Sequence, residues 1–114
     1  MAVHKLENYL KAYRKRAGIS QNEMGYLLGG RDGTKASRYE HFKRKPNLET
    51  ALACEALFHI PVRELFAGMY ERAQRQTSSR ARRLRKRLKV NGVCQLRIAK
   101  LLDEVANEKS KRGA

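Results

Sequence analysis

The stretch Ser20–Pro46, SQNEMGYLLGGRDGTKASRYEHFKRKP, decides the fold of this chain, because it predicts two short helices joined by a glycine turn. Ser20 and Glu23 have the S-x-x-E spacing of a capping box, in which each side chain accepts a hydrogen bond from a backbone amide at the helix start. Gly29 and Gly30 end this helix, since glycine takes the left-handed conformation without penalty. A helix, a tight turn and a second helix are typical of the helix-turn-helix arrangement.

The first of these helices carries Met24, Leu27 and Leu28 at helical spacing, which predicts one buried edge. Gly25 lies in the middle of the helix, where glycine costs about 1 kcal/mol relative to alanine. We therefore expect a crossing helix to approach closely at Gly25, where no side chain intervenes.

The second helix is expected to run from about Gly33 to Phe42, with Asp32 as its cap. Ala36 and Tyr39 would then turn inward. The other faces are polar and basic, and carry Thr34, Lys35, Ser37, Arg38 and His41. Such an outer face suits a helix that lies in a DNA groove.

These residues resemble the lambda-repressor/Cro-like (XRE) helix-turn-helix family. The family pattern runs roughly R-x5-G-[LI]-[ST]-Q-x-x-[LM]-[AG]-x-x-[LI]-G, then a recognition helix, then E-x-G-x-x-x-P. Its positions are matched here, within about residues 5–68, by Arg14, Gly18, Ile19, Ser20, Gln21, Met24, Gly25, Leu28, Gly29, Ser37, Glu40 and Pro46. The chain departs from the pattern by one residue inserted in the turn. Phe42 and His59 also replace the glycines that usually follow the third and fourth helices.

The resemblance implies an all-α fold with a five-helix lambda-repressor-like helix-turn-helix domain, which we assign to residues 1–76. Residues 77–114 are expected to form a basic helical extension. It also places Arg14 opposite Glu40 in a semi-buried ion pair, with Gln21 beside them. The residue types agree, because a guanidinium can clamp a carboxylate with two hydrogen bonds. The alternative is that Arg14 and Glu40 are two solvated surface charges.

The expected function is sequence-specific binding of duplex DNA by a homodimer on an inverted-repeat operator, as in a transcriptional repressor. The residues expected near base edges are Gly33, Thr34, Lys35, Ser37 and Arg38. Thr34 and Arg38 are the preferred readers, since the inserted residue leaves the register of Lys35 and Ser37 open, and Gly33 would let the backbone approach the groove. The residues expected at phosphates are Gln21, Arg31, His41, Lys43, Arg44 and Lys45. Ordinary helix surface remains the alternative for Thr34 and Ser37, and a solvated loop for residues 43–45.

Three further helices complete the expected domain. The first runs from about His4 to Ala17, with a stripe of Leu6, Tyr9, Leu10 and Tyr13. Asn47 caps a helix from Leu48 to about Phe58, and Pro61 starts the last one. The apolar side chains expected in the core of these last two helices are Leu52, Ala56, Leu57, Phe58, Val62, Leu65, Phe66 and Met69.

The charge of the chain indicates a polyanionic partner. Its 114 residues include 26 Lys and Arg against 11 Asp and Glu, a net charge of +15, and nucleic acid is the usual partner for such a protein. No apolar run is long enough to span a bilayer and no signal-peptide pattern is visible, so we expect a cytoplasmic, nucleoid-associated protein without a membrane partner.

The extension carries the larger share of this charge, a net +9 in residues 77–114 against +6 in residues 1–76. Thr77–Ser79 is a predicted linker or cap, and Arg80–Lys89 a helix with seven cations. After a turn at Asn91–Gly92, a final helix would run from Val93 to about Asn107. Its apolar stripe comprises Cys94, Ile98, Leu101, Leu102 and Val105.

Several roles are open for the extension. Dimerisation through the stripe of the final helix is favoured over docking of that stripe within the same chain. The arginine-rich helix would add phosphate contacts, or would become ordered only on DNA. Binding to an anionic membrane is disfavoured, because the apolar face of this helix holds two leucines and no aromatic residue.

Other functions are weighed against the repressor. The same family includes antitoxins, which would add a toxin or other small protein as partner, and the arginine-rich extension fits a less specific RNA-binding or nucleoid protein. An enzyme is not expected, because no nucleophile motif or phosphate loop is present and His4, His41 and His59 have no metal-ligand spacing. No cofactor or metal is expected either. Cys54 and Cys94 are predicted to be reduced core thiols.

Overall fold

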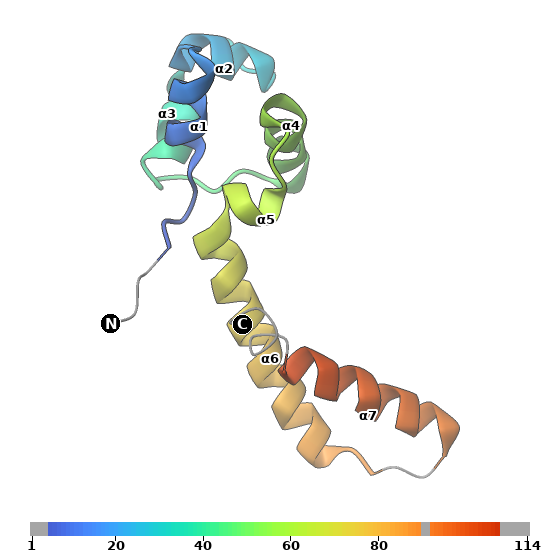
Figure 1. Ribbon diagram of the computed structural model, residues 1–114. Coiled ribbons are helices and arrows are strands. Elements are labelled where there is room, and N and C mark those ends of the chain that lie inside the picture. The colour runs from blue at the N-terminus through green and yellow to red at the C-terminus, as the bar shows by residue number, and fades with distance from the viewer. Residues whose placement is uncertain (1–4, 90–91, 108–114) are drawn as a thin grey trace. The chain divides into compact units, whose positions relative to one another are not determined.

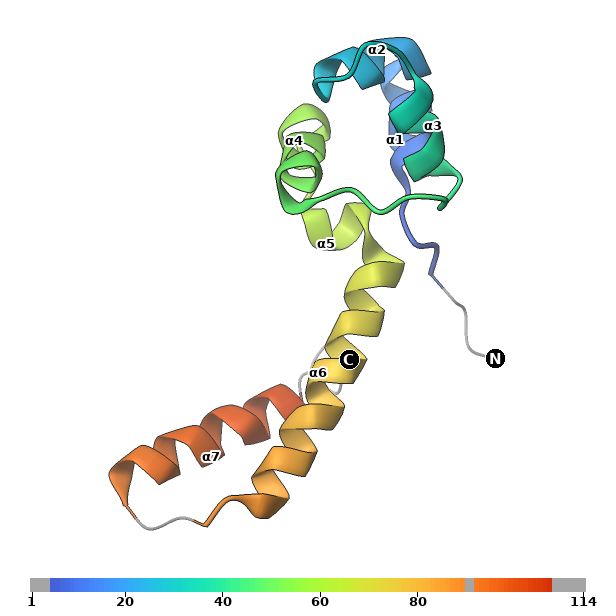
Figure 2. The ribbon, with the colours of Figure 1, turned by 180° about the vertical axis from the view of Figure 1, so that it is seen from behind.

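The computed structural model describes residues 5–89 and 92–107. Every regular element in these ranges is an α-helix and none is a strand, which confirms the all-α prediction. The helices are α1 (Leu10–Ala17), α2 (Gln21–Leu27), α3 (Thr34–Glu40), α4 (Leu48–Phe58), α5 (Val62–Leu65), α6 (Ala67–Arg87) and α7 (Val93–Ala106), drawn in Figure 1 and from behind in Figure 2. The chain divides into two compact units, Met1–Tyr70 and Glu71–Ala114. Among the helices described, none combines the length and apolar character needed to cross a membrane.

The first unit has one hydrophobic core, to which α1, α2, α4 and α5 each contribute a fully buried side chain. These side chains are Leu10, Met24, Cys54 and Leu65. Burial raises the pKa of the Cys54 thiol to about 11, so this cysteine is an unreactive core thiol, as predicted. Leu27, Leu52 and Ala56 were expected in the core, but all three are exposed.

Helix α1 begins at Leu10, later than the predicted start near His4, which lies outside the described residues. Tertiary hydrogen bonds explain the difference. The amide of Tyr9 donates to the Leu65 carbonyl at 2.8 Å, and the Leu6 carbonyl accepts from the Gly68 amide at 2.8 Å. Because these backbone groups bond to distant segments, they are not available for the i to i−4 bonds of a helix. Leu6 is consequently exposed rather than part of a buried stripe.

Helix α2 starts with the predicted capping box. The Glu23 amide donates to Ser20 Oγ at 3.0 Å, and the Ser20 amide donates to a Glu23 carboxylate oxygen at 2.8 Å. Hydrogen bonding to the Glu23 carboxylate, first from the Ser20 backbone and then from the Ser20 side chain, lowers the pKa of Glu23. At the other end, Gly29 has φ +90°, the left-handed conformation expected of a glycine that ends a helix.

Two helix ends in this unit hold a non-glycine residue in the left-handed conformation. Phe42, after α3, has φ 61°, and His59, which caps α4, has φ 58°. These are the two positions at which the XRE pattern usually has glycine. Each site carries a steric penalty of about 1–2 kcal/mol, because a side chain opposes the left-handed conformation.

We predict that His59→Gly stabilises the first unit by about 1 kcal/mol, because glycine has no Cβ to oppose the left-handed conformation. Thermal unfolding should show a melting temperature higher by a few degrees. His41→Gly is the matched control, since His41 also ends a helix but has φ −93°. The control should lower the melting temperature, and a loss of stability in both variants would contradict the prediction.

The second unit is built from the larger part of α6 and from α7. Thr77–Ser79 was predicted to be a linker or cap, but α6 runs through it without a break. The Ser78 hydroxyl is buried and donates to the Val105 carbonyl at 2.9 Å, so it joins α6 to α7 instead of ending a helix. Arg85 forms an ion pair with Asp103 at 3.1 Å, and the buried side chains Ala81, Ala99 and Leu102 complete the packing. Asn91, part of the predicted turn, lies outside the described residues.

Candidate nucleic-acid interface

The junction between α2 and α3 is held by three local features. Gly33 donates its amide to Asn22 Oδ1 at 2.8 Å, which links the start of α3 to α2. The amide of Thr34, the first residue of α3, donates to Asp32 Oδ1 at 2.9 Å, although the N-cap position is Gly33 and not the predicted Asp32. A Cβ at Gly25 would overlap the Asp32 carbonyl oxygen. The close approach predicted at Gly25 is therefore present, although it is made by the loop before α3 rather than by a crossing helix.

Helix α3 separates its apolar and polar side chains as predicted. Ala36 and Tyr39 are buried in the core. The side chains of Thr34, Lys35 and Arg38 are exposed, and Ser37 is half-buried. The residues expected to face a ligand therefore lie on the outer side of α3.

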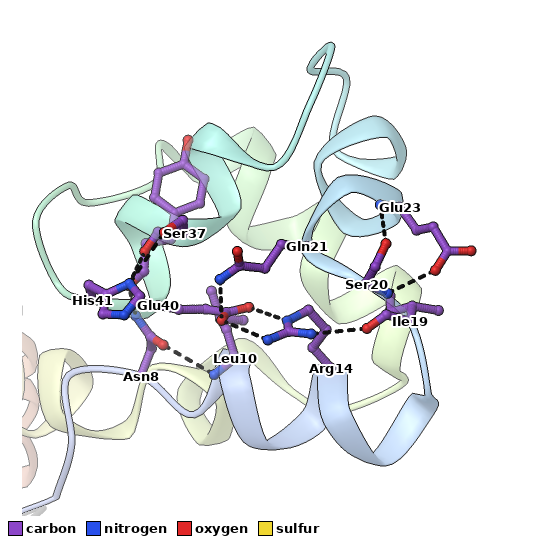
Figure 3. Close-up of polar contacts among 11 residues, drawn as sticks. Asn8, Leu10, Arg14, Ile19, Ser20, Gln21, Glu23, Ser37, Glu40 and His41 are labelled. Carbon is purple, nitrogen blue, oxygen red and sulfur yellow. Dashed lines mark hydrogen bonds and ion pairs between the residues drawn. The ribbon is translucent and has the colours of Figure 1, made fainter.

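An ion pair between α1 and α3 fixes the orientation of α3 (Figure 3). Arg14 donates from Nε to Glu40 Oε2 at 2.6 Å and from Nη2 to Glu40 Oε1 at 3.2 Å, while its Nη1 donates to the Ile19 carbonyl at 3.0 Å. The Glu40 side chain is fully buried and that of Arg14 is 11% exposed. The predicted ion pair is thus bidentate and largely shielded from water, and the alternative of two solvated charges is excluded.

Two further side chains complete this polar network. Gln21 Nε2 donates to Glu40 Oε1 at 3.3 Å. Gln21, which was predicted to bind a DNA phosphate, therefore also supports the ion pair. Its amide keeps a second N–H for another acceptor. The buried side chain of Asn8 donates to the Tyr39 carbonyl at 2.8 Å and accepts from the Leu10 amide at 3.1 Å, which connects the start of α1 to the end of α3.

A surface depression of about 610 Å³ brings together much of the predicted site. It is lined by Gln21, Asn22, Asp32, Gly33, Thr34, Ser37, Arg38, His41 and Lys43. The predicted residues Arg31, Lys35, Arg44 and Lys45 are exposed but do not line it. The depression therefore lies along the start of α2 and the polar face of α3.

Gly33 has a clear packing role in this depression. It is buried, and a Cβ there would lie 2.9 Å from the backbone of Gln21 and from the Asn22 side chain. Its lack of a side chain lets the start of α3 pack closely on α2. This role does not depend on a ligand, and the predicted approach of Gly33 to a groove remains a prediction.

The polar groups of the depression differ in the hydrogen bonds that they can still make. Asp32 is fully exposed, and hydrogen bonds from Thr34, first its side chain and then its backbone, lower the pKa of the Asp32 carboxyl. His41 Nδ1 lies 2.7 Å from the Ser37 carbonyl oxygen, which can only accept, so Nδ1 carries the proton (Figure 3). The outer Nε2 of a neutral His41 is then an acceptor, and only the charged ring can donate to a phosphate.

Sequence reasoning missed Asn22 and Asp32 as lining residues. Asp32 was predicted only as the N-cap of α3, a position that Gly33 occupies, and its carboxylate also puts one negative charge within a mainly cationic site. Asn22 had no distinguishing signal, because an exposed asparagine in the first turn of a helix is common. Its role depends on a hydrogen bond to Gly33, eleven residues away in the chain.

The second unit has a separate basic surface on α6. Arg80, Arg83, Lys86 and Arg87 are exposed, and their spacing places them on the side of α6 away from Ser78 and Ala81. Since Ser78 and Ala81 are the buried residues of α6, the basic side points away from the packed side of this helix. The arrangement agrees with the cationic face predicted for the arginine-rich helix.

The described residues offer no metal site, and known proteins offer no match. Among the described residues, no three His, Cys, Asp or Glu side chains are grouped so that they could hold a metal ion. Comparisons with protein-family models, with curated proteins and with solved structures found no match to this chain.

Proposed function

We propose that this protein is a sequence-specific duplex-DNA-binding regulator, in which α2 and α3 form a helix-turn-helix of the lambda-repressor type and α3 enters the major groove. The observation that carries the proposal is the face of α3 that bears Thr34, Ser37 and Arg38. This face is solvent-accessible and lines the depression, while the opposite face is fixed by the core and by the Arg14–Glu40 ion pair.

The residue types on this face suit base recognition. Arg38 can donate two hydrogen bonds to the N7 and O6 acceptors of guanine, a contact worth about 1–3 kcal/mol of discrimination. The exposed cations Lys43, Arg44 and Lys45 follow α3 in the loop before α4, where they can contact phosphates. Gln21 and the amides at the start of α2 supply further phosphate donors.

The regulator would act as a homodimer on an inverted-repeat operator, with two copies of α3 in successive major grooves. The stripe predicted for dimerisation is divided by the fold, because Leu102 is buried while Ile98 and Leu101 are exposed and Val105 is half-buried. The side chain of Cys94 lies outside the described part of the chain. The exposed residues of the stripe remain available for a second copy.

A second candidate function is sequence-independent binding of nucleic acid, including RNA, and the basic side of α6 favours it. Its four exposed cations carry no base-reading geometry and would act through phosphates alone. The two functions differ in one measurable property, since the second predicts similar affinity for unrelated sequences at one fixed salt concentration. The antitoxin alternative would instead be supported by a small protein that co-purifies with this chain.

Two matched substitutions test the regulator. Arg38→Ala should reduce the preference for an operator over unrelated DNA by about 1–3 kcal/mol, because a base contact is lost. Lys43→Ala should weaken binding to all sequences alike and reduce the slope of log affinity against log salt by about 1. Competition binding at several salt concentrations measures both effects. An unchanged operator preference in Arg38→Ala would show that α3 does not read bases through this residue.

A further inference from the structure

The outer face of α7 has the composition of a helix–helix contact but no partner among the described residues of its own unit. Leu101 is 57% exposed and Ile98 is 43% exposed, while Ala99 and Leu102 on the adjoining side are buried. Cys94, Ile98, Leu101 and Val105 follow one another at intervals of four, three and four residues. This is the spacing of the apolar positions a and d of a coiled coil, with Ile98 and Val105 at a and Cys94 and Leu101 at d.

The charges beside this face distinguish the orientation of a partner. Arg97 and Glu104 are one heptad apart and are both exposed, and both occupy position g. In an antiparallel pair of identical helices, g positions face each other. Ile98 then lies in one layer with Leu101 of the partner subunit, and Arg97 comes opposite Glu104 of the partner subunit. Two-fold symmetry repeats each pair, so both copies of both charges are matched.

A parallel pair does not match Arg97 with an opposite charge. It would place position g opposite position e, which sets Arg97 beside Leu102 of the partner subunit. Leu102 is buried within its own unit, so that contact offers neither a charge nor an accessible surface. The position of Arg97 thus favours an antiparallel pair with a second copy of this chain.

We propose that α7 pairs with α7 of a second copy of this chain in an antiparallel, two-fold symmetric seam formed by Ile98, Leu101 and Val105 and bordered by Arg97–Glu104 ion pairs. The seam rests on the homodimer of the proposed function and specifies how that homodimer forms. Its test contains no DNA, so the seam can fail while DNA binding stands.

Oligomeric state is the first readout, measured by sedimentation equilibrium on the full chain. Leu101→Ala should weaken the dimer. Leu96→Ala should not, although Leu96 is equally exposed at 59%, because it lies off the seam. A chain that is monomeric at all concentrations would overturn both the seam and the homodimer. A dimer that tolerates Leu101→Ala as well as Leu96→Ala would overturn the seam alone.

Charge exchange is the second readout. Arg97→Glu alone and Glu104→Arg alone should each raise the dimer dissociation constant by roughly tenfold at low salt, because attraction becomes repulsion at two symmetric sites. A mixture of the two variants should recover the affinity. In the mixed dimer, one chain carries acidic side chains at positions 97 and 104 and the other carries basic ones, so both pairs are again attractive. Failure of the mixture to recover it would overturn the ion pairs.

Disulfide formation reports the direction of the helices. In a Cys94→Ala background, the remaining native thiol Cys54 is buried and unreactive. A mixture of Ile98→Cys and Leu101→Cys chains should form a mixed disulfide faster than either chain alone, whereas Val105→Cys alone should form none. Efficient linking of Val105→Cys to itself would establish a parallel pair and overturn the antiparallel seam.

Discussion

Replacing Arg14 with methionine should destabilise the first unit by about 3–5 kcal/mol, because it leaves the Glu40 carboxylate buried without its ionic partner. The Glu40 side chain is fully buried and receives two hydrogen bonds from Arg14. Gln21 would remain as a single donor at 3.3 Å, which does not balance a desolvated charge. Chemical denaturation, read by circular dichroism, measures the change.

A double substitution separates the ion pair from simple packing. Arg14→Met combined with Glu40→Leu removes both charges, and its stability should lie well above that of the single variant, since buried pairs can often be replaced by apolar residues. Lys15→Met is the surface control, because Lys15 is exposed and should change stability by less than about 0.5 kcal/mol. If Arg14→Met were as stable as Lys15→Met, the ion pair would not hold α3 in place.

Gly25→Ala should also destabilise the first unit strongly, by about 2–3 kcal/mol after the gain in helix propensity is included. The added Cβ would overlap the carbonyl oxygen of Asp32, and its carbon lies only 2.8 Å away. Because both are backbone atoms, no side chain can rotate to make room. The loop before α3 must move, so DNA affinity should fall together with stability.

Tyr26→Ala is the control for this substitution. Tyr26 neighbours Gly25 in α2 but is 75% exposed, so alanine there should change stability by less than about 0.5 kcal/mol. A crystal structure or amide exchange of the Gly25→Ala chain would locate the displacement at Asp32 and the start of α3. Wild-type stability in this variant would show that α2 and the loop are not closely packed.

Local signals predicted the parts of the fold that depend on neighbouring residues. The capping box of Ser20 and Glu23 and the glycine that ends α2 need only a few residues in sequence order, and both are confirmed. The Arg14–Glu40 ion pair spans a longer distance, and it was predicted through the resemblance rather than through periodicity. Helix starts were less predictable, because α1 is shortened by backbone hydrogen bonds to Leu65 and Gly68, which no local pattern specifies.

In residues 77–114, the sequence pattern predicted the helices but not where α6 continues or which side chains are buried. The segment Thr77–Ser79 has the residue types of a helix cap, yet the Ser78 hydroxyl bonds to α7 and the helix continues. The apolar stripe of α7 was predicted from the sequence, but the sequence did not show which of its residues would be buried. Leu102 faces inward in its own unit while Leu101 is exposed, and only the packed hairpin distinguishes these adjacent residues.

The candidate interface was predicted at the level of its helix and less well at the level of each residue. Thr34 and Arg38, the preferred readers, line one depression together with Ser37, but the sequence did not separate Ser37 from Lys35. Which side chains of α3 face the depression depends on the rotation of this helix about its own axis, and the buried Tyr39 and Glu40 fix that rotation. The hydrogen bond between Asn22 and Gly33, which sets the start of α3, has no sequence signature.

The central claim is that α3 reads a specific sequence in duplex DNA within a two-fold symmetric dimer, and selection of bound fragments from random duplex DNA tests it most directly. We predict enrichment of an inverted repeat with half-sites centred about 34–36 Å apart, or one helical turn. Recovery of unrelated fragments that bind with similar affinity at one fixed salt concentration would contradict it.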